Sequence, residues 1–278
     1  MAIYLQTNTS ALFAEQNFNT TQMSLNSSFT KLSSGYRINS AADDAAGLGI
    51  AKSMNAQVQS YAMAQQNAND AVSMVQTADS AANQVDSLLT RMRQLAVEAQ
   101  NGTMASKDVN NLNTEFQQDL SEIDRVATDT TFNGSALLSS GTAGASFSVT
   151  YQVGINGSAN DQINVTFGGA DSTGLSLAGA SVTSASGGGN ILTAIDAAMS
   201  TLSTQRAGFG AAMNRLSDAA ATIESTQTNL SAALSTIQDV DVASETSQLA
   251  REQVLAQAGA SVLSQANSAP QLALKLLG

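Results

Sequence analysis

The sequence predicts a mainly α-helical protein. The expected fold is a long antiparallel helical hairpin, or coiled-coil rod, with a small β-hairpin insert and with terminal helices that pair as an inner layer. Two apolar ladders with heptad spacing occupy the two halves of the chain, and neither helix can bury its ladder alone. Aromatic residues make up only 4% of the chain, whereas a compact core normally contains more large side chains. Pro270 is the single proline, so almost nothing interrupts the helices.

Both ladders alternate steps of three and four residues, which places the members of each ladder on one helical stripe. The first ladder comprises Tyr61, Ala64, Ala68, Ala71, Val75, Ala78, Ala82, Val85, Leu89, Met92 and Ala96. The second comprises Ile195, Met199, Leu202, Arg206, Phe209, Met213, Leu216, Ala220, Ile223, Gln227, Leu230, Leu234 and Ile237. Each stripe needs a partner, and the other ladder is the obvious candidate. Arg206 and Gln227 either face solvent at the edge of the stripe or set its register, as single polar residues do in coiled coils.

Charge and composition exclude several classes of function. The net charge is −11, and no basic cluster is present that could neutralise nucleic-acid phosphates or bind an anionic membrane. The chain has no His and no Cys, which removes the commonest general base, thiol catalysis and Cys-ligated zinc. We therefore expect no enzymatic activity, no cofactor and no metal. No apolar run is long enough to cross a bilayer, and the N-terminus lacks the features of a cleaved secretory signal.

The N-terminal segment carries a weak apolar stripe. Its members are Phe18, Leu25, Phe29, Leu32 and Tyr36. The remaining residues are largely Asn, Thr, Ser and Gln, so an isolated helix here would be marginal in water. We expect the segment to be disordered in the monomer and to fold on assembly. The candidate inner-core packing residues are Phe18, Leu25, Phe29 and Leu32 in this segment and Leu255, Val262 and Leu263 in the last helix.

A break around Gly35 separates this segment from the first ladder helix. Ser40 and Asp43 form an S-x-x-D pattern typical of a helix start. Asp43 and Asp44 would then lie in the first turn, where the helix dipole favours negative charge. The ladder helix is expected to end at Gly102, a good C-cap residue, and a shorter helix should follow over about 107–128.

The middle of the chain changes character. Phe147, Val149, Tyr151, Val153 and Ile155 alternate with small or polar residues, and so do Ile163, Val165 and Phe167. This period of two predicts a β-hairpin, with turn chemistry supplied by Asn156-Gly157. The Gly/Ser-rich stretch that follows is expected at the surface.

The C-terminal part is expected to contain the second ladder helix over about 190–238 and a last helix over about 242–267, which Pro270 ends. The apolar tail that follows needs a partner or a chaperone. The predicted division is 1–40 for an inner-core helix and linker, 41–138 and 191–240 for the two parts of the helical rod, 139–190 for the hairpin and surface segment, and 241–278 for the C-terminal inner-core helix.

Several motifs resemble those of bacterial flagellins. Residues 32–47 read LSSGYRINSAADDAAG and are similar to that family's N-terminal signature LSSGLRINSAKDDAAG. Other similar stretches are NAND at 67–70, RMRQLAV at 91–97, EIDRV at 122–126, TFNG at 131–134 and AGASVLSQAN at 258–267. The resemblance covers about 1–138 and 190–278. The chain departs from the family pattern at Tyr36, Ala42 and Gln94, and it lacks the large variable outer domains of long flagellins.

This resemblance implies a structural subunit that polymerises into the extracellular flagellar filament and is exported unfolded by the flagellar type III apparatus. The implied partners are further copies of the chain, an export chaperone on the C-terminal segment, filament cap and junction proteins, and, for the monomer, the host Toll-like receptor that senses flagellin. The receptor-contact residues carried over are Arg91, Leu95 and Glu115. The assembly and linker signature comprises Ser33, Ser34, Gly35, Arg37, Asn39, Asp43 and Asp44.

Three other functions compete with this one. A hook–filament junction protein would share the terminal motifs and stays open as the alternative. An enzyme with a zinc site in the middle segment would need a motif such as H-E-x-x-H, which a chain without His lacks. A secreted coiled-coil adhesin would share the heptads but has no reason to carry the signature at 32–47.

Overall fold

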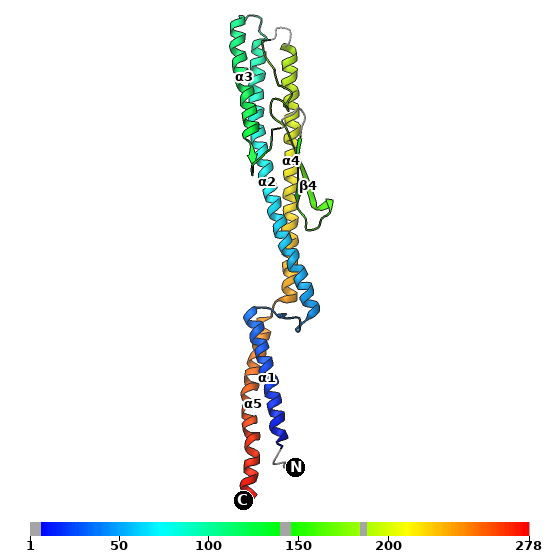
Figure 1. Ribbon diagram of the computed structural model, residues 1–278, viewed down its shortest axis with the longest axis vertical. Coiled ribbons are helices and arrows are strands. Elements are labelled where there is room, and N and C mark those ends of the chain that lie inside the picture. Colours follow the sequence, from blue (N-terminus) through cyan, green and yellow to red (C-terminus); the bar gives the residue numbers. More distant parts are fainter. Residues whose placement is uncertain (1–6, 140–145, 184–187, 278) are drawn as a thin grey trace. The chain divides into compact units, whose positions relative to one another are not determined.

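The computed structural model describes residues 7–139, 146–183 and 188–277. Over these residues the chain is mainly helical with a small antiparallel hairpin, which confirms the expected fold class (Figure 1). The elements are α1 (Thr9–Ser34), α2 (Ala45–Ala99), α3 (Ser106–Asp129), β1 (Thr131–Phe132), β2 (Ser135–Ala136), β3 (Ser146–Gln152), a 3-10 turn (Ala159–Asp161), β4 (Gln162–Gly168), α4 (Gly188–Gln238) and α5 (Val242–Leu277).

The chain divides into two compact units, which are described separately. Unit 1 comprises Met1–Gln57 together with Asn229–Gly278, and unit 2 comprises Val58–Thr228. Helices α2 and α4 each contribute residues to both units. Unit 1 also contains α1 and α5, whereas α3 and all the strands belong to unit 2.

The core of unit 2 confirms the two ladders. Every member of the first ladder from Ala64 to Ala96 is buried, and Tyr61 packs against this core. In the second ladder Ile195, Leu202, Phe209, Leu216 and Ile223 are buried in the same core, and Met199, Met213 and Ala220 pack against it. The two stripes therefore cover each other, as their spacing predicts.

Two ion pairs join α2 to α4 within unit 2. Arg206 Nε lies 3.0 Å from Asp79 Oδ1, and Arg93 Nε lies 2.7 Å from Asp196 Oδ1. The residue number falls on one helix as it rises on the other, so the two helices are antiparallel. The Arg93 guanidinium lowers the pKa of Asp196 by donating to its carboxylate. Arg206 is half-buried and paired with a residue of the opposite ladder helix, which favours a register-setting role for it. Gln227 is also half-buried.

The predicted hairpin is present as β3 and β4, which pair from Ser146 with Gly168 to Gln152 with Gln162. The alternating residues of β4 turn inward, and Ile163, Val165 and Phe167 are buried. The Phe167 ring lies 5.5 Å from the ring of Phe209 on α4. Apolar alternation in one strand therefore docks the hairpin onto a ladder helix.

Asn156 and Gly157 do lie in the connection between the two predicted strands, but this connection, the loop 153–161, is longer than a tight turn. A two-residue turn instead joins β1 to β2 at Asn133 and Gly134, whose φ angles are 49° and 81°. Both angles are positive, as a type I′ turn requires. The strands are only two residues long, too short for alternation to reveal them.

The Gly/Ser-rich segment was expected at the surface, and this prediction is wrong for residues 169–182, which we call the strap. The strap places Ala170, Leu175, Leu177 and Val182 in the core of unit 2. Side chains of α3 hold it by hydrogen bonds from Ser172 to Asp124, from Gln117 to the Ala180 carbonyl, and from Ser181 and Val182 to Asn113. Small and polar residues dominate the composition of the strap. Its four apolar core positions follow no regular period, so the sequence pattern did not predict their burial.

The start of α2 also differs from its prediction. The helix begins at Ala45, and Asp44 is its N-cap, because the Asp44 carboxylate accepts the Gly47 N–H at 2.8 Å. Asp43 instead accepts the backbone N–H groups of Asn39 and Ser40 in the preceding turn. The S-x-x-D pattern therefore marks a turn, and the true cap lies four residues later.

Pro270 does not end the last helix. Helix α5 continues through it to Leu277. A proline inside a helix removes one backbone hydrogen bond and costs about 3 kcal/mol. That penalty does not forbid the helix, which has already formed over the preceding turns from Val242.

The contact between the hairpin and α4 gives a stability prediction. Phe209→Ala removes a fully buried ring and should lower the free energy of unfolding by about 3–5 kcal/mol. The matched change Phe147→Ala removes a ring that is 42% exposed on β3 and should cost less than about 1.5 kcal/mol. Urea denaturation of the full chain, followed by circular dichroism, measures both. Equal losses would contradict this account of the core.

Candidate assembly surface

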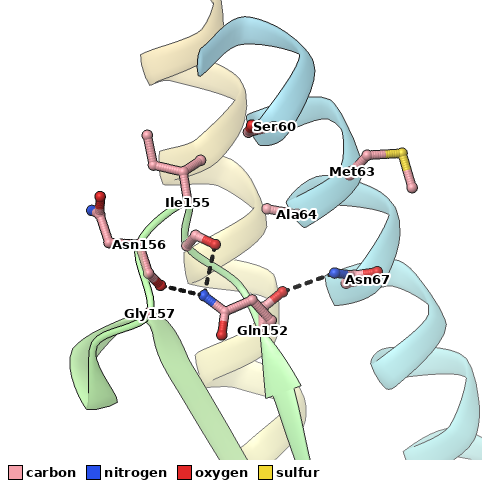
Figure 2. Close-up of a pocket in the computed structure, with 9 residues that line it drawn as sticks. Ser60, Met63, Ala64, Asn67, Gln152, Ile155, Asn156 and Gly157 are labelled. Atoms are coloured by element: carbon pink, nitrogen blue, oxygen red, sulfur yellow. Dashed lines mark hydrogen bonds between the residues drawn. The ribbon is translucent and has the colours of Figure 1, made fainter. Parts of the chain in front are cut away.

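The described residues contain no arrangement suited to metal chemistry, since no three of their His, Cys, Asp or Glu side chains could hold an ion together. An open groove of about 400 Å³ lies between α2 and the 153–161 loop (Figure 2). It is lined by Ser60, Met63, Ala64, Asn67, Gln152, Gly154, Ile155, Asn156 and Gly157. Asn67 Nδ2 donates to the Gln152 carbonyl at 3.1 Å. The groove offers amides and apolar atoms, but neither an acid nor a base for catalysis.

The terminal helices α1 and α5 lie side by side within unit 1 (Figure 1). They run antiparallel: Asn8, the N-cap of α1, donates from its side chain to the Ala266 carbonyl at 2.7 Å. A Cβ added to Gly259 would lie 3.4 Å from the Phe18 ring, so a glycine allows the two helices to approach closely.

We define the terminal seam as the row of half-buried and buried residues that these two helices direct at each other. On α1 it comprises Ala11, Ala14, Phe18, Thr21, Ser24, Leu25, Ser28, Lys31 and Leu32. On α5 it comprises Glu245, Leu249, Glu252, Ala256, Gly259, Leu263 and Ala266. Both rows keep a three-and-four spacing, but small and polar residues outnumber the large apolar ones in each.

Four of the seven expected packing residues lie in this seam: Phe18, Leu25, Leu32 and Leu263. The other three point away from it, and Phe29, Leu255 and Val262 are about half exposed. The sequence predicted that these seven residues pack in an inner core, but it did not distinguish contacts within one chain from contacts between chains. The geometry separates them into an internal row and an external one.

The external row belongs to a larger set, which we call the terminal apolar surface. It comprises Leu12, Phe13, Met23 and Phe29 on α1 and Val254, Leu255 and Val262 on α5, all of them exposed. A groove of about 610 Å³ between the two helices is lined in part by Phe18, Leu25 and Val254. Large apolar side chains that stay exposed on paired helices are candidates for an interaction surface.

A break motif connects the helices of unit 1. Gly35 ends α1 with a φ of 76°, and its N–H donates to the Lys31 carbonyl at 2.9 Å. Residues with a Cβ rarely adopt this angle. The Gly35 carbonyl accepts the Val240 N–H at 3.0 Å, and the Arg37 N–H donates to Gln238 at 2.7 Å. These bonds tie the end of α1 to the α4–α5 connection.

The remaining signature residues stiffen the same linker. Asn39 Nδ2 donates to Ser34 Oγ at 2.8 Å. The Asp43 carboxylate accepts the Ser40 N–H at 2.8 Å and the Ser40 hydroxyl at 3.0 Å. These hydrogen bonds lower the pKa of Asp43, because they favour its charged form. Ser33 is exposed. The signature therefore forms a hydrogen-bonded connector, and two of its members, Ser33 and Ser34, also line an open groove of about 420 Å³ together with Phe29 and Thr30.

The three receptor-contact candidates do not share one environment. Arg91 Nε donates to Glu115 Oε1 at 2.9 Å, and both side chains are roughly half exposed. Leu95, one turn after Arg91, is completely buried in the core. Asp119 lies on α3 one turn after Glu115, and its pKa is raised by burial and by the charge of Glu115. The structure thus brings Arg91 and Glu115 together at the surface and places Leu95 beneath it.

Sequence reasoning missed Glu252, the least expected member of the terminal seam. Its side chain is only 6% exposed, and its Oε2 has no hydrogen-bond partner among the described residues. Oε1 accepts from Gln248 at a long 3.3 Å. Glu245, one heptad earlier, also has a buried oxygen without such a partner. The signal that could have identified them is the heptad spacing of α5. Glu245 and Glu252 are seven residues apart and continue the row that contains Gly259 and Ala266.

A carboxylate enclosed in a helix seam opposes the pairing of the helices, because its desolvation is poorly compensated. The terminal seam therefore combines a destabilising charge inside with large apolar groups outside. Within the single chain the external row stays uncovered and the Glu252 carboxylate stays enclosed.

Comparison with known families finds two matches. Residues 5–143 match the model of the bacterial flagellin N-terminal helical region, and residues 192–277 match that of the bacterial flagellin C-terminal helical region. Together these two matches cover most of the chain. None of the described helices combines the length and hydropathy needed to span a membrane.

Individual flagellin sequences are similar to this chain over most or all of its length. A flagellin of Xenorhabdus nematophila is 40% identical over the whole of both chains, and one of Halalkalibacterium halodurans is 37% identical over 89% of each. A crystal structure of Bacillus cereus flagellin aligns with a TM-score of 0.47 and 29% identity, covering 61% of this chain and 94% of that one. The assignment of the chain to a family rests on the two family models and on the sequence relatives.

The enclosed carboxylate gives a second prediction. Glu252→Leu should stabilise the pairing of α1 and α5 by about 1–3 kcal/mol, because it removes a buried carboxylate oxygen that has no hydrogen-bond partner among the described residues. Amide hydrogen exchange of the full-length monomer should show slower exchange in both helices. Gln265→Leu, at an exposed position of the same helix, is the control and should leave exchange in α1 unchanged. Faster exchange in Glu252→Leu would show that the carboxylate supports the seam.

Proposed function

The chain belongs to the bacterial flagellin family, and on this premise we propose that its terminal apolar surface drives polymerisation. It is a structural subunit of the extracellular flagellar filament and not an enzyme. The observation that carries the proposal is the exposure of Phe13, Leu255, Val262 and their neighbours on helices that already pair with each other. Further copies of the same chain are the partners that can cover this surface.

The energetics support assembly through these helices. Burial of one large apolar side chain contributes about 1.5–3 kcal/mol. The exposed residues occupy both α1 and α5, so a subunit can contact one neighbour through one helix and another neighbour through the other. Head-to-tail contacts of this kind give an open helical polymer when the rotation between copies does not close.

Export of the subunit follows the same logic. We propose that the chain leaves the cell unfolded through the flagellar type III apparatus, and that a chaperone holds the C-terminal segment until then. A weak terminal seam supports this route, because little free energy is needed to keep α1 and α5 apart. Filament cap and junction proteins are the proposed partners at the two ends of the polymer. The inner-core and signature residues identified from the sequence are proposed to act in this assembly.

A hook–filament junction protein is the alternative function. Such a protein would add to the end of a filament without extending it. The 40% identity to a flagellin over the whole of both chains favours the filament subunit. Assembly kinetics distinguish the two, since a junction protein stops seeds from growing and a subunit lengthens them.

The assembly test compares four chains in seeded polymerisation viewed by negative-stain microscopy. The full chain should lengthen the seeds, and a version without residues 1–35 and 243–278 should not. Phe13→Ser should raise the critical concentration roughly ten-fold or more, because the lost burial of one ring is worth at least that factor. Phe147→Ser, an exposed ring outside the terminal helices, is the matched control. An equal effect of both changes would remove the terminal helices as the driving surface.

We also propose that the monomer engages the host Toll-like receptor through the surface around Arg91 and Glu115. The exposure of this ion pair supports direct contact, while Leu95 would act from the core by fixing the position of α2. In a filament this surface would be covered by neighbouring subunits.

Reporter cells carrying the receptor should therefore respond to monomer and not to intact filaments. Arg91→Ala should weaken the response to monomer, and Lys52→Ala, an exposed cation elsewhere on α2, should not. No response to a saturating dose of monomer would remove the receptor from the list of partners, while leaving the assembly proposal untouched.

A further inference from the structure

The sequence contains three Asn-Gly pairs, at 101–102, 133–134 and 156–157. In such a pair the peptide nitrogen of the glycine can attack the side-chain amide of the asparagine, because no Cβ on the glycine blocks the approach. The attack requires rotation of the asparagine backbone and side chain toward each other. Local structure therefore decides which pair reacts, and the three pairs lie in three different settings.

The first pair is held by hydrogen bonds after the end of α2. Asn101 Oδ1 accepts the Thr103 N–H at 3.2 Å and the Thr103 hydroxyl at 2.9 Å. The Asn101 N–H donates to the Glu98 carbonyl at 3.0 Å, and its own carbonyl accepts the Met104 N–H at 3.0 Å. Both the side chain and the backbone would have to break bonds before the ring could close.

The second pair forms the tight turn between β1 and β2. Asn133 and Gly134 have φ angles of 49° and 81°. Pairing of Phe132 with Ser135 clamps the turn on both sides, and the Leu137 N–H donates to the Thr130 carbonyl at 3.0 Å just beyond it. Rotation of the Asn133 backbone would open this small hairpin.

The third pair is held far more loosely. Asn156 lies in the 153–161 loop, and its side-chain amide makes no hydrogen bond with the described residues. Figure 2 shows this side chain pointing away from α2 and from Gln152. A Cβ built on Gly157 would meet nothing within 4 Å, as is also the case for Gly102 and Gly134, so the restraint on the asparagine is what distinguishes the three pairs. One tether remains, from Gln152 Nε2 to the Asn156 carbonyl at 2.6 Å.

We propose that Asn156 is a site of spontaneous deamidation in the folded chain. A bond forms between the Gly157 nitrogen and Asn156 Cγ, the Cγ–Nδ2 bond breaks, and Nδ2 leaves as ammonia with the proton from the glycine nitrogen. Water then opens the cyclic imide at either carbonyl, which gives aspartate or isoaspartate at 156. Water is the only co-reactant, and no enzyme takes part.

The product would change the groove shown in Figure 2. Its lining side chains carry no charge, and the reaction adds one carboxylate beside Ile155. In the isoaspartate form the main chain runs through the former side chain, which displaces the carbonyl that Gln152 holds. Gln152 Nε2 also donates to the Gly154 carbonyl at 2.9 Å, so the whole loop would lose part of its support.

The test follows all three pairs in one sample. The purified full-length chain is incubated in mildly alkaline buffer, and peptide mapping by mass spectrometry gives the rate at each asparagine. Conversion at Asn156 should exceed conversion at Asn101 by at least about ten-fold, which corresponds to the hydrogen bonds that Asn101 must break. In concentrated urea the three rates should converge, since the folded structure no longer distinguishes them. Equal rates in the folded chain would overturn the proposal.

Two variants sharpen the result. Gln152→Ala removes the remaining tether and should accelerate conversion at Asn156 while leaving Asn101 and Asn133 unchanged. Asn156→Gln should abolish the fast conversion, because the longer side chain forms the corresponding ring poorly. Persistence of the fast signal in Asn156→Gln would assign it to another residue and would also overturn the proposal.

Discussion

A long helix with an apolar stripe on one side cannot be stable in water until something covers that stripe, and this constraint organises the whole subunit. In unit 2 the requirement is met within the chain. Val75, Leu89 and the alanines between them meet the second ladder in one core, and the hairpin and strap close that core from other directions. In unit 1 it is met only in part, because much of the terminal seam is small or polar and many of the larger apolar residues lie outside it. Unit 2 thus covers its ladders within the chain, whereas unit 1 leaves exposed the large apolar residues that, on the proposed function, contact other subunits.

The alanine content of the first ladder has a direct geometric role. Ala68, Ala71, Ala78 and Ala82 are completely buried, and small side chains at such positions allow neighbouring helices to lie close together. Small contacts specify alignment weakly, however, since one alanine can replace another along the stripe. The pairs Arg206–Asp79 and Arg93–Asp196 supply the missing alignment, because each forms at only one offset between the helices. Packing and register are thus assigned to different residues of the same two helices.

Periodicity predicted most of this fold, because long regular elements repeat their signal many times. The ladders, the short α3 helix and the alternation of β4 all appear where the sequence placed them. The failures share a cause, which is dependence on single contacts. Asp44 caps α2 because its carboxylate reaches Gly47, and the strap is buried because α3 side chains hold it. The candidate site was also predicted only in part. The apolar packing residues were found, but their division between an internal and an external row depends on the rotation of each helix about its axis. Glu252 was overlooked because a carboxylate is rarely buried.

The enclosed Glu252 has a consequence for how polymers begin. On the proposed function, two free subunits that meet must both fix their weakly paired terminal helices at once, and each encloses a carboxylate that opposes the pairing. A subunit that meets an existing polymer end finds helices that are already fixed, so the conformational entropy of only one partner is lost. If the terminal helices drive polymerisation as proposed, elongation is favoured over nucleation. Subunits can accumulate at high concentration without starting new polymers, and growth is confined to places where an ordered end is already present.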